Sequence, residues 1–216
     1  MKTNLIVTLL LFLCSSLCYG QKWNYGLEFG YTHNIFHSPK LKGTGKSGFR
    51  IGGILNYNFK NNVLLESGIA YERKGRSLKS NNIASQQITK VDIHNMDYLN
   101  MPFLIGYKIH VGNKLYLYPQ LGWYLNVGLR GCGTISGIDR WDQPYTSGID
   151  VFQAYNGNTY TYRPFNRIDT GSLFCLNIQF NAFRIKCSYE LGLNTIHSIY
   201  GGPNNRIIGL ALGYIL

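Results

Sequence analysis

Apolar and polar residues alternate along most of the chain. From Trp23 to Tyr31 every second residue is apolar or aromatic, and Asn, Gly and Glu stand between them. A period of two indicates a β-strand with one apolar face, because successive side chains of a strand point to opposite faces of the sheet. The pattern recurs, so that strands are predicted in the segments 23–31, 49–59, 63–71, 99–109, 115–129, 174–180, 183–193 and 208–216.

These segments predict an all-β fold, an eight-stranded antiparallel up-and-down transmembrane β-barrel. Most have about the 9 to 11 residues that a tilted strand needs to cross the hydrocarbon layer. A soluble, lipocalin-like barrel would show the same alternation, so the volume of the side chains has to distinguish the two. The interior of an eight-stranded barrel is just wide enough to be filled by side chains. The many large apolar residues do not fit there, so we expect them to face lipid.

The connections alternate between short and long, as they do in outer-membrane barrels. Short periplasmic turns are predicted near 60–62, 111–113 and 181–182. Long extracellular loops are predicted over 32–47, 73–97, 131–167 and 195–205. With an even number of strands, both ends of the barrel domain are expected in the periplasm.

The polar positions of the strands hold glycines and charged residues that are expected to fill the lumen. Four acids and five bases nearly neutralise one another, and paired buried charges cost far less than unpaired ones. We therefore predict a barrel closed by a structural charge network rather than an open pore. The network consists of Glu28, Arg50, Glu66, Glu72, Lys108, Arg130, Arg184, Lys186 and Glu190.

The first residues have the pattern of a secretory signal peptide. A charged start precedes an apolar run over 5–13 that is too short to span a bilayer as a helix. Small residues before Gln21 predict cleavage there, which divides the chain into a signal peptide, 1–20, and a barrel domain, 21–216. An uncleaved anchor is the alternative. No later apolar run has the length of a membrane-spanning helix, so a chain that enters the membrane does so as a closed barrel, in the outer membrane of a Gram-negative bacterium.

The chain is basic, with a formal net charge of +11. Such a surplus is common in nucleic-acid-binding proteins, but a secreted chain rarely meets nucleic acid. Several bases fall in the expected extracellular loops, where they would meet the phosphates of lipopolysaccharide; ordinary solvated loops are the competing interpretation. The bases considered for this contact are Lys40, Lys42, Lys46, Lys74, Arg76 and Lys79.

The longest predicted loop contains a hairpin signal. Two alternating runs flank Asn156-Gly157, and Asn-Gly is the strongest short-range signal for a two-residue hairpin turn. Exposed strand edges recruit partner strands, so the hairpin over 151–162 is our candidate for contact with another envelope protein; a self-packed loop is the alternative. The contact residues would be Val151, Tyr155, Asn156, Gly157, Tyr160 and Tyr162.

Two segments carry a family resemblance. The segments 65–75, LESGIAYERKG, and 98–108, YLNMPFLIGYK, resemble the PorT-like outer-membrane β-barrel family of Bacteroidetes, whose barrel is of the eight-stranded OmpA/OmpX type. The sequence departs from the family pattern at Asn100 and Met101, and its last residue, Leu216, is not aromatic. The resemblance implies outer-membrane localisation, and one branch of the family is tied to type IX secretion and gliding.

No catalytic, metal or cofactor site is expected. A lipid-modifying barrel hydrolase needs a Ser or Cys nucleophile within hydrogen-bond reach of a His that an acid orients, and His197 beside Ser198 supplies only a fragment. The expected function is therefore non-enzymatic, structural or partner-binding through the extracellular loops. An accessory role in type IX secretion and a lipid hydrolase are the alternatives.

Overall fold

The computed structural model describes residues 23–35, 42–79, 88–138, 141, 143–156, 161–162, 165–194 and 205–216. The predicted signal peptide, 1–20, lies outside these residues. In the part of the chain that is described, no helix has the length and apolar character needed to cross a membrane.

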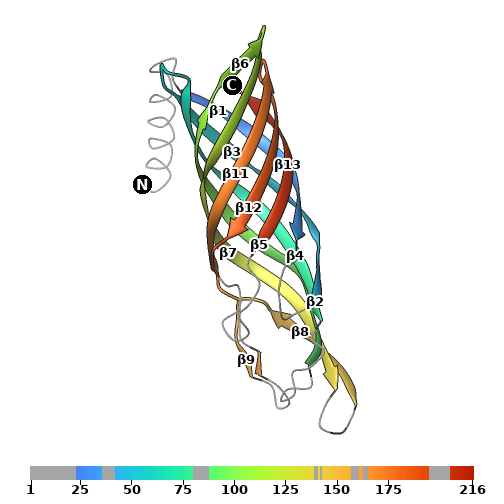
Figure 1. Ribbon diagram of the computed structural model, residues 1–216. Helices are drawn as coiled ribbons and strands as arrows, with labels where there is room; N and C mark the ends of the chain where they lie inside the picture. Colours follow the sequence, from blue (N-terminus) through green and yellow to red (C-terminus); the bar gives the residue numbers. More distant parts are fainter. Residues whose placement is uncertain are drawn as a thin grey trace, which may run out of the picture.

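Eight long strands form a closed cylinder, which confirms the predicted fold (Figure 1). Each strand pairs antiparallel with its neighbour along the chain, and the last pairs with the first, so the barrel closes. The barrel strands are β1 (Trp23–Ile35), β3 (Ser47–Asn58), β4 (Val63–Lys79), β5 (Ile88–Tyr107), β7 (Leu115–Ile138), β11 (Ile168–Phe180), β12 (Phe183–Gly192) and β13 (Arg206–Ile215). The described residues also form the shorter strands β2 (Lys42–Gly45), β6 (Ile109–Gly112), β8 (Pro144–Asp150), β9 (Tyr155–Asn156) and β10 (Thr161–Tyr162).

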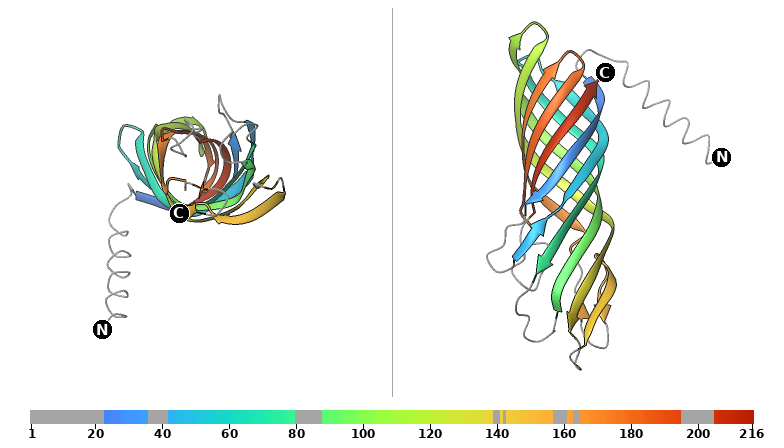
Figure 2. Two further views of the ribbon diagram at one scale, coloured as in Figure 1. Left: turned by 90° about the horizontal axis from the view of Figure 1, so that it is seen from below. Right: turned by 90° about the vertical axis from the view of Figure 1, so that its right-hand side faces the viewer.

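Tight turns join the strands at one end of the barrel, the end at which the chain also finishes (Figures 1 and 2). Each of these turns contains a residue with positive φ: Asn62 (64°), Lys114 (66°) and Asn181 (53°). Asn adopts this left-handed region more readily than most residues, which suits two of the three positions. The middle turn lies at 113–114, slightly later than the predicted 111–113. We call this end the periplasmic end and the opposite one the outer end.

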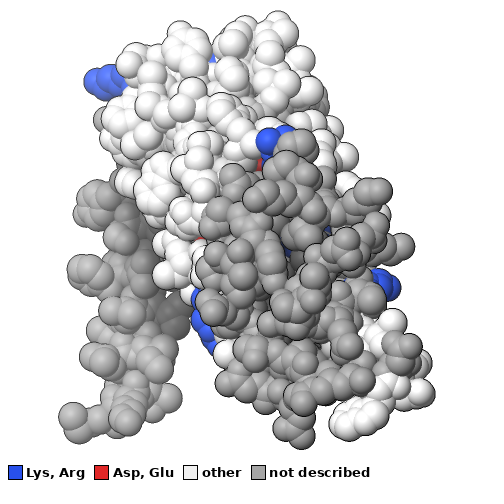
Figure 3. All heavy atoms as spheres, turned by 60° about the horizontal axis from the view of Figure 1, so that its bottom comes forward, with Lys and Arg blue, Asp and Glu red and all other residues white. Residues whose placement is uncertain are grey.

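Large apolar side chains cover the outside of the barrel. On β1, for example, Leu27 and Phe29 are 70% and 58% exposed, whereas Glu28 between them is buried. The visible barrel wall is almost uncharged (Figure 3). Aromatic rings pack against one another near the periplasmic end, where Trp23 meets Tyr57 at 4.7 Å between ring centroids and Phe183 meets Tyr214 at 5.3 Å. This lipid-facing wall is apolar where a hydrocarbon layer would surround it.

The strands continue past this wall at the outer end, so the predicted loop boundaries were wrong there. β4 runs on to Lys79, β5 begins at Ile88 and β7 reaches Ile138, although these residues were assigned to loops 73–97 and 131–167. β2 pairs with β4, and β8 pairs with β7. The result is a sheet in the order β2-β4-β5-β7-β8 that stands beyond the barrel (Figure 2). We call it the outer extension.

Candidate binding surface at the outer end

Two glutamates and two bases form the first part of the lumen network, in the half of the barrel near the short turns. The guanidinium of Arg184 donates to Glu28 Oε2 and to Glu66 Oε2, each at 2.5 Å. The ammonium of Lys186 lies 3.0 Å from Glu66 Oε1 and 3.4 Å from Glu28 Oε2. All four side chains are almost fully buried, so each charge depends on the others for the solvation that water no longer provides.

A second group of four charges lies further along the lumen. Arg50 contacts Glu190 and lies 3.0 Å from Glu72 Oε1, and Lys74 Nζ is 3.1 Å from Glu72 Oε2. Lys74 also reaches Glu190 Oε2 at 3.5 Å. The structure thus brings together seven of the nine residues predicted for the lumen network, all but Lys108 and Arg130, and adds Lys74.

Amides carry the lumen network on towards the outer end. Arg76 donates to Asn205, whose amide donates to Asp169 Oδ2 at 2.8 Å. Asn126 also donates to Asp169, at 3.4 Å, and receives a hydrogen bond from Asn100 at 2.6 Å. Among the described residues the buried lumen then holds five acids and five bases. Within the described residues, ion pairs and hydrogen bonds thus join side chains of different strands across the lumen.

Lys74 and Arg76 were predicted to contact lipopolysaccharide, and this prediction was wrong. Both are 2% exposed and point into the lumen. The reason is that β4 does not end at the lipid-facing wall, so its even-numbered residues keep facing inward. Among the other candidates, Lys42 and Lys79 lie opposite each other in the pairing of β2 with β4, and Lys40 lies outside the described residues.

Arg130 was predicted to face the lumen but lies outside it, with 75% of its side chain exposed. The pairing of β5 with β7 shifts register here, since Asp97 lies opposite Arg130 but the next residue, Tyr98, lies opposite Gly128. Leu129 is therefore the extra residue of a β-bulge. One extra residue reverses the faces of every later side chain, which turns Arg130 outwards.

Lys108 also stands apart from the ion pairs. It lies in a break between β5 and β6, where pairing with β7 stops at Gly106 and resumes at Ile109. Its ammonium instead lies 4.7 Å from the ring centroid of Tyr116 and 5.6 Å from that of Tyr118, a cation–π arrangement. Lys108 thus borders the lumen at its periplasmic end.

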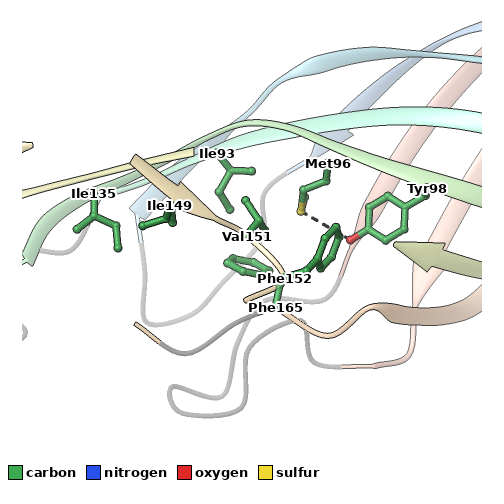
Figure 4. Packing of buried hydrophobic residues seen from close by; sticks show 8 residues of the cluster. All are labelled: Ile93, Met96, Tyr98, Ile135, Ile149, Val151, Phe152 and Phe165. Carbon is green, nitrogen blue, oxygen red and sulfur yellow. Dashed lines mark hydrogen bonds between the residues drawn. The ribbon is translucent and has the colours of Figure 1, made fainter. Parts of the chain in front are cut away.

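A hydrophobic cluster packs under the outer extension (Figure 4). β5, β7 and β8 contribute one side of it, and the chain after β8 contributes the other. The Phe152 ring meets Tyr98 edge to face at 5.7 Å, in the space left by the missing side chain of Gly128, where a Cβ would lie 2.5 Å from the ring. The members of this cluster, the outer cap, are Ile93, Met96, Tyr98, Ile135, Ile149, Val151, Phe152 and Phe165.

The outer cap corrects part of the predicted contact hairpin. Val151 is fully buried in the cluster, so it is not available to a partner. β9 and β10 pair with each other, with Asn156 opposite Thr161 and Tyr155 opposite Tyr162. Gly157 and Tyr160 lie outside the described residues.

Two aspartates on the outer surface each hold two bases. Asp92 lies 2.5 Å from Lys46 Nζ and 3.3 Å from Lys90 Nζ. Asp97 accepts hydrogen bonds from Arg73 and Arg130; we call Arg73, Asp97 and Arg130 the rim cluster. Burial favours a higher pKa for Asp97, but the hydrogen bonds from the two arginines outweigh it and hold that pKa below its usual value. The same balance, with the two lysines as donors, lowers the pKa of Asp92.

The described residues do not assemble a hydrolase site. His33 Nδ1 lies 3.3 Å from Ser47 Oγ, which also contacts the hydroxyl of Tyr31. A serine nucleophile needs a base that a third group orients, and no described carboxylate contacts His33. His197 and Ser198 lie outside the described residues. No group of three or more potential metal ligands occurs in the described part either.

Comparison with known proteins identifies the family. The model of the outer membrane protein beta-barrel domain matches residues 19–198. The chain belongs to this family. A member of the family with a closed, lipid-faced barrel is a protein of the cell outer membrane. No curated protein sequence matches the chain.

Solved outer-membrane barrels are similar to this family member at low sequence identity. OprG from Pseudomonas aeruginosa is 11% identical, with 91% of this chain and 98% of that chain covered and a TM-score of 0.52. Ail, the attachment invasion locus protein of Yersinia pestis, is 16% identical over 91% of this chain and 100% of that chain, with a TM-score of 0.39. Neisserial surface protein A is 13% identical over 90% and 96% of the two chains, with a TM-score of 0.40. At 11% identity the likeness to OprG concerns the fold alone.

Proposed function

We propose that this protein is a non-enzymatic outer-membrane barrel that binds another envelope protein through its outer end. The observation that carries the proposal is the outer cap, because it gives the outer extension a hydrophobic core of its own. A sheet with a packed core presents a rigid surface, and rigid surfaces lose little entropy on binding. Because ion pairs occupy the lumen, the contact is proposed for the outer end and not for the inside of the barrel.

The contact is proposed to lie on the hairpin formed by β9 and β10. The chain leaves and re-enters the outer cap at neighbouring points, since Phe165 N donates to Val151 O at 2.9 Å. The residues between them therefore form an excursion whose ends are fixed by the cluster. A short strand pair held in this way can present backbone groups to a partner strand.

The proposal is tested by replacing residues 154–162 with a short Gly-Ser linker. This change removes β9 and β10 but keeps Val151, Phe152 and Phe165, so the outer cap remains. Tagged wild-type and variant barrels are cross-linked in native outer membranes, purified and analysed by mass spectrometry. We expect one protein that the wild type captures to be lost from the variant.

A matched control is the Trp141→Ser substitution, which alters an exposed residue between β7 and β8 and should leave capture unchanged. Heat-modifiable migration in detergent shows that each barrel is folded. If the linker variant captures the same proteins as the wild type in equal amount, the hairpin is not the contact.

Contact with lipopolysaccharide is also proposed for the bases of the outer extension. Without the buried Lys74 and Arg76, the sequence-derived set reduces to Lys40, Lys42, Lys46 and Lys79. Positive charges at the outer end would attract the phosphates of the outer leaflet, more strongly at low salt. The contact is checked by adding salt to the barrel bound to lipopolysaccharide micelles. We expect the salt to release the barrel.

We further propose that the chain belongs to the PorT-like branch of Bacteroidetes barrels. The two segments that carry the resemblance are adjacent paired strands, β4 and β5. An accessory role in type IX secretion and gliding is the alternative function attached to that branch. It predicts that a strain without this protein fails to secrete the substrates of that system, whereas a partner-binding barrel predicts normal secretion.

Residues 1–20 are proposed to be a signal peptide that is removed on export. Mass spectrometry of the protein purified from outer membranes should show a chain that begins at Gln21. A retained Met1 would support the uncleaved anchor instead.

A further inference from the structure

One row of paired residues runs from the lipid-facing wall to a group of charged residues. The residues lie directly opposite one another on β1, β3, β4, β5 and β7, and opposite residues of paired strands share a face. This face is the outer surface of the barrel. In order around the barrel the row is Tyr31, Phe49, Arg73, Asp97 and Arg130.

The aromatic half of the row belongs to the lipid-facing wall, and the rim cluster begins beside it. The guanidinium carbon of Arg73 lies 5.8 Å from the ring centroid of Phe49 and 6.0 Å from that of Tyr71. Arg73 also donates to the hydroxyl of Tyr71 at 2.9 Å. The bases of the rim cluster therefore stand at the height where the apolar wall ends and the polar interface of the membrane begins.

Asp97 fixes the two arginines in place. Arg73 binds both of its oxygens, through Nε at 2.7 Å and Nη2 at 3.1 Å, and Arg130 binds it through Nε at 2.8 Å. The Asp97 side chain is 1% exposed, whereas those of Arg73 and Arg130 are 35% and 75% exposed. The aspartate is thus covered by its partners, and the surface that remains is made of guanidinium groups.

Two positive charges against one negative charge leave the rim cluster with a net charge of +1 that faces outwards. Arg130 donates to Asp97 through Nε, so that hydrogen bond does not use its two Nη groups. The fork of N–H groups in a guanidinium matches the oxygens of a phosphate, and it loses little conformational freedom when it is already oriented.

We propose that the rim cluster is a binding site for the phosphate group of an outer-leaflet glycolipid. The glycolipid would place its acyl chains against the apolar wall beside Phe49 and its phosphate on Arg130 and Arg73. This site lies nearer the membrane than the lysines of the outer extension, and it is independent of the proposed protein contact at the hairpin. Its neighbour, the pair of lysines on Asp92, lies further from the membrane along β5.

The test uses the full barrel in phosphatidylcholine nanodiscs that contain lipid A, either with its phosphates or after enzymatic dephosphorylation. Lipid A without core sugars restricts contact to the height of the membrane interface. Bound lipid is counted by native mass spectrometry for wild type, Arg130→Gln, Arg73→Gln/Arg130→Gln and Lys90→Gln. Lys90→Gln is the matched control because it removes the same charge as Arg130→Gln from the same outer face.

Wild type is expected to prefer phosphorylated lipid A by about tenfold or more, since hydrogen bonds to charged groups contribute about 1.5–3 kcal/mol and 1.4 kcal/mol is a factor of ten. Arg130→Gln should lose most of this preference, the double variant all of it, and Lys90→Gln none. Arg130 is exposed, so this variant should fold, as heat-modifiable migration verifies. The proposal is overturned if wild type shows no preference or if Arg130→Gln and Lys90→Gln behave alike. Displacement of lipid A by millimolar inorganic phosphate would equally overturn the assignment to a lipid.

Discussion

Substitution of Arg184 by Met should be among the most damaging single changes in the barrel. The side chain of Arg184 is fully buried and makes a charged hydrogen bond to each of two glutamates, Glu28 and Glu66, at 2.5 Å. Its removal leaves both carboxylates to one ammonium, that of Lys186. Breaking a buried ion pair by removing one partner costs about 3–5 kcal/mol. With a slope of about 2 kcal/mol per molar urea, the unfolding midpoint should fall by about 2 M.

The assay is reversible urea unfolding of the barrel in detergent micelles, followed by tryptophan fluorescence and by heat-modifiable migration. The informative comparison is the double variant Arg184→Met/Glu28→Gln. It restores the balance of charge, because Glu66 keeps Lys186 at 3.0 Å and a hydrogen bond from Gln120 at 3.1 Å. We expect the double variant to regain about 1–3 kcal/mol relative to the single one. Lys60→Ala, at an exposed turn residue, should stay within about 0.5 kcal/mol of wild type.

Two results would refute this reasoning. If Arg184→Met shifts the midpoint no more than Lys60→Ala does, the lumen charges do not depend on one another. If the double variant is as unstable as the sum of its single changes, the loss comes from packing and not from an unpaired carboxylate.

Three further predictions follow from the packing and the electrostatics. Gly52→Ala should impair barrel formation because the new Cβ would lie 2.5 Å from the Cα of Ala70. Gly53→Ala should be tolerated because no atom lies nearer than 3.9 Å to the position of its Cβ. The folded fraction of each variant on gels compares them. Phe152→Ala should cost about 3–5 kcal/mol in the outer cap, seen as faster amide exchange in the outer extension while the barrel remains folded. The pKa of Asp97 is lowered in the folded protein. Its contribution to stability is therefore complete above the pKa of the unfolded state and is lost as the pH falls through the lower pKa of the folded state. Asp97→Asn should remove this acid-dependent loss of stability, measured by thermal unfolding between about pH 2 and about pH 6.

The barrel could be predicted because every strand has one face that contacts lipid and is therefore apolar. The alternation from Trp23 to Tyr31 can be recognised without knowing the neighbouring strands. The structure shows its apolar residues facing outwards. The same rule placed Glu28 and Arg184 on the inner face, where they meet. Period-two patterning is thus sufficient wherever one face is apolar and the other is polar.

The outer part of β4 was harder to predict because both of its faces carry polar residues. Arg73, Lys74 and Arg76 lie within four positions of β4, yet Arg73 faces outwards and the other two face the lumen. The amino-acid composition does not show which of these side chains faces outwards. The continued pairing of β4 with its neighbours shows it. Arg130 was misplaced for a related reason, since a bulge at Leu129 depends on the neighbouring strand and leaves no mark in the pattern of its own strand.

The outer cap was also missed by the sequence patterns. Its residues come from three strands and from three positions after β8, so no segment shows a continuous apolar run. Gly128 is a small signal, because its bare backbone accommodates the Phe152 ring. A glycine has that meaning only when the side chain that packs on it is known.

The ion pairs of the lumen also constrain how the chain assembles. Arg184 and Glu28 are separated by 156 positions, and Arg50 and Glu190 by 140. These charges meet only when the last strands pair with the first. A partly closed sheet that entered the hydrocarbon layer would therefore carry these charges without their partners. Desolvating unpaired charges is very costly. Complete closure and insertion are therefore coupled, and the same residues that fill the finished barrel oppose the insertion of an unfinished one.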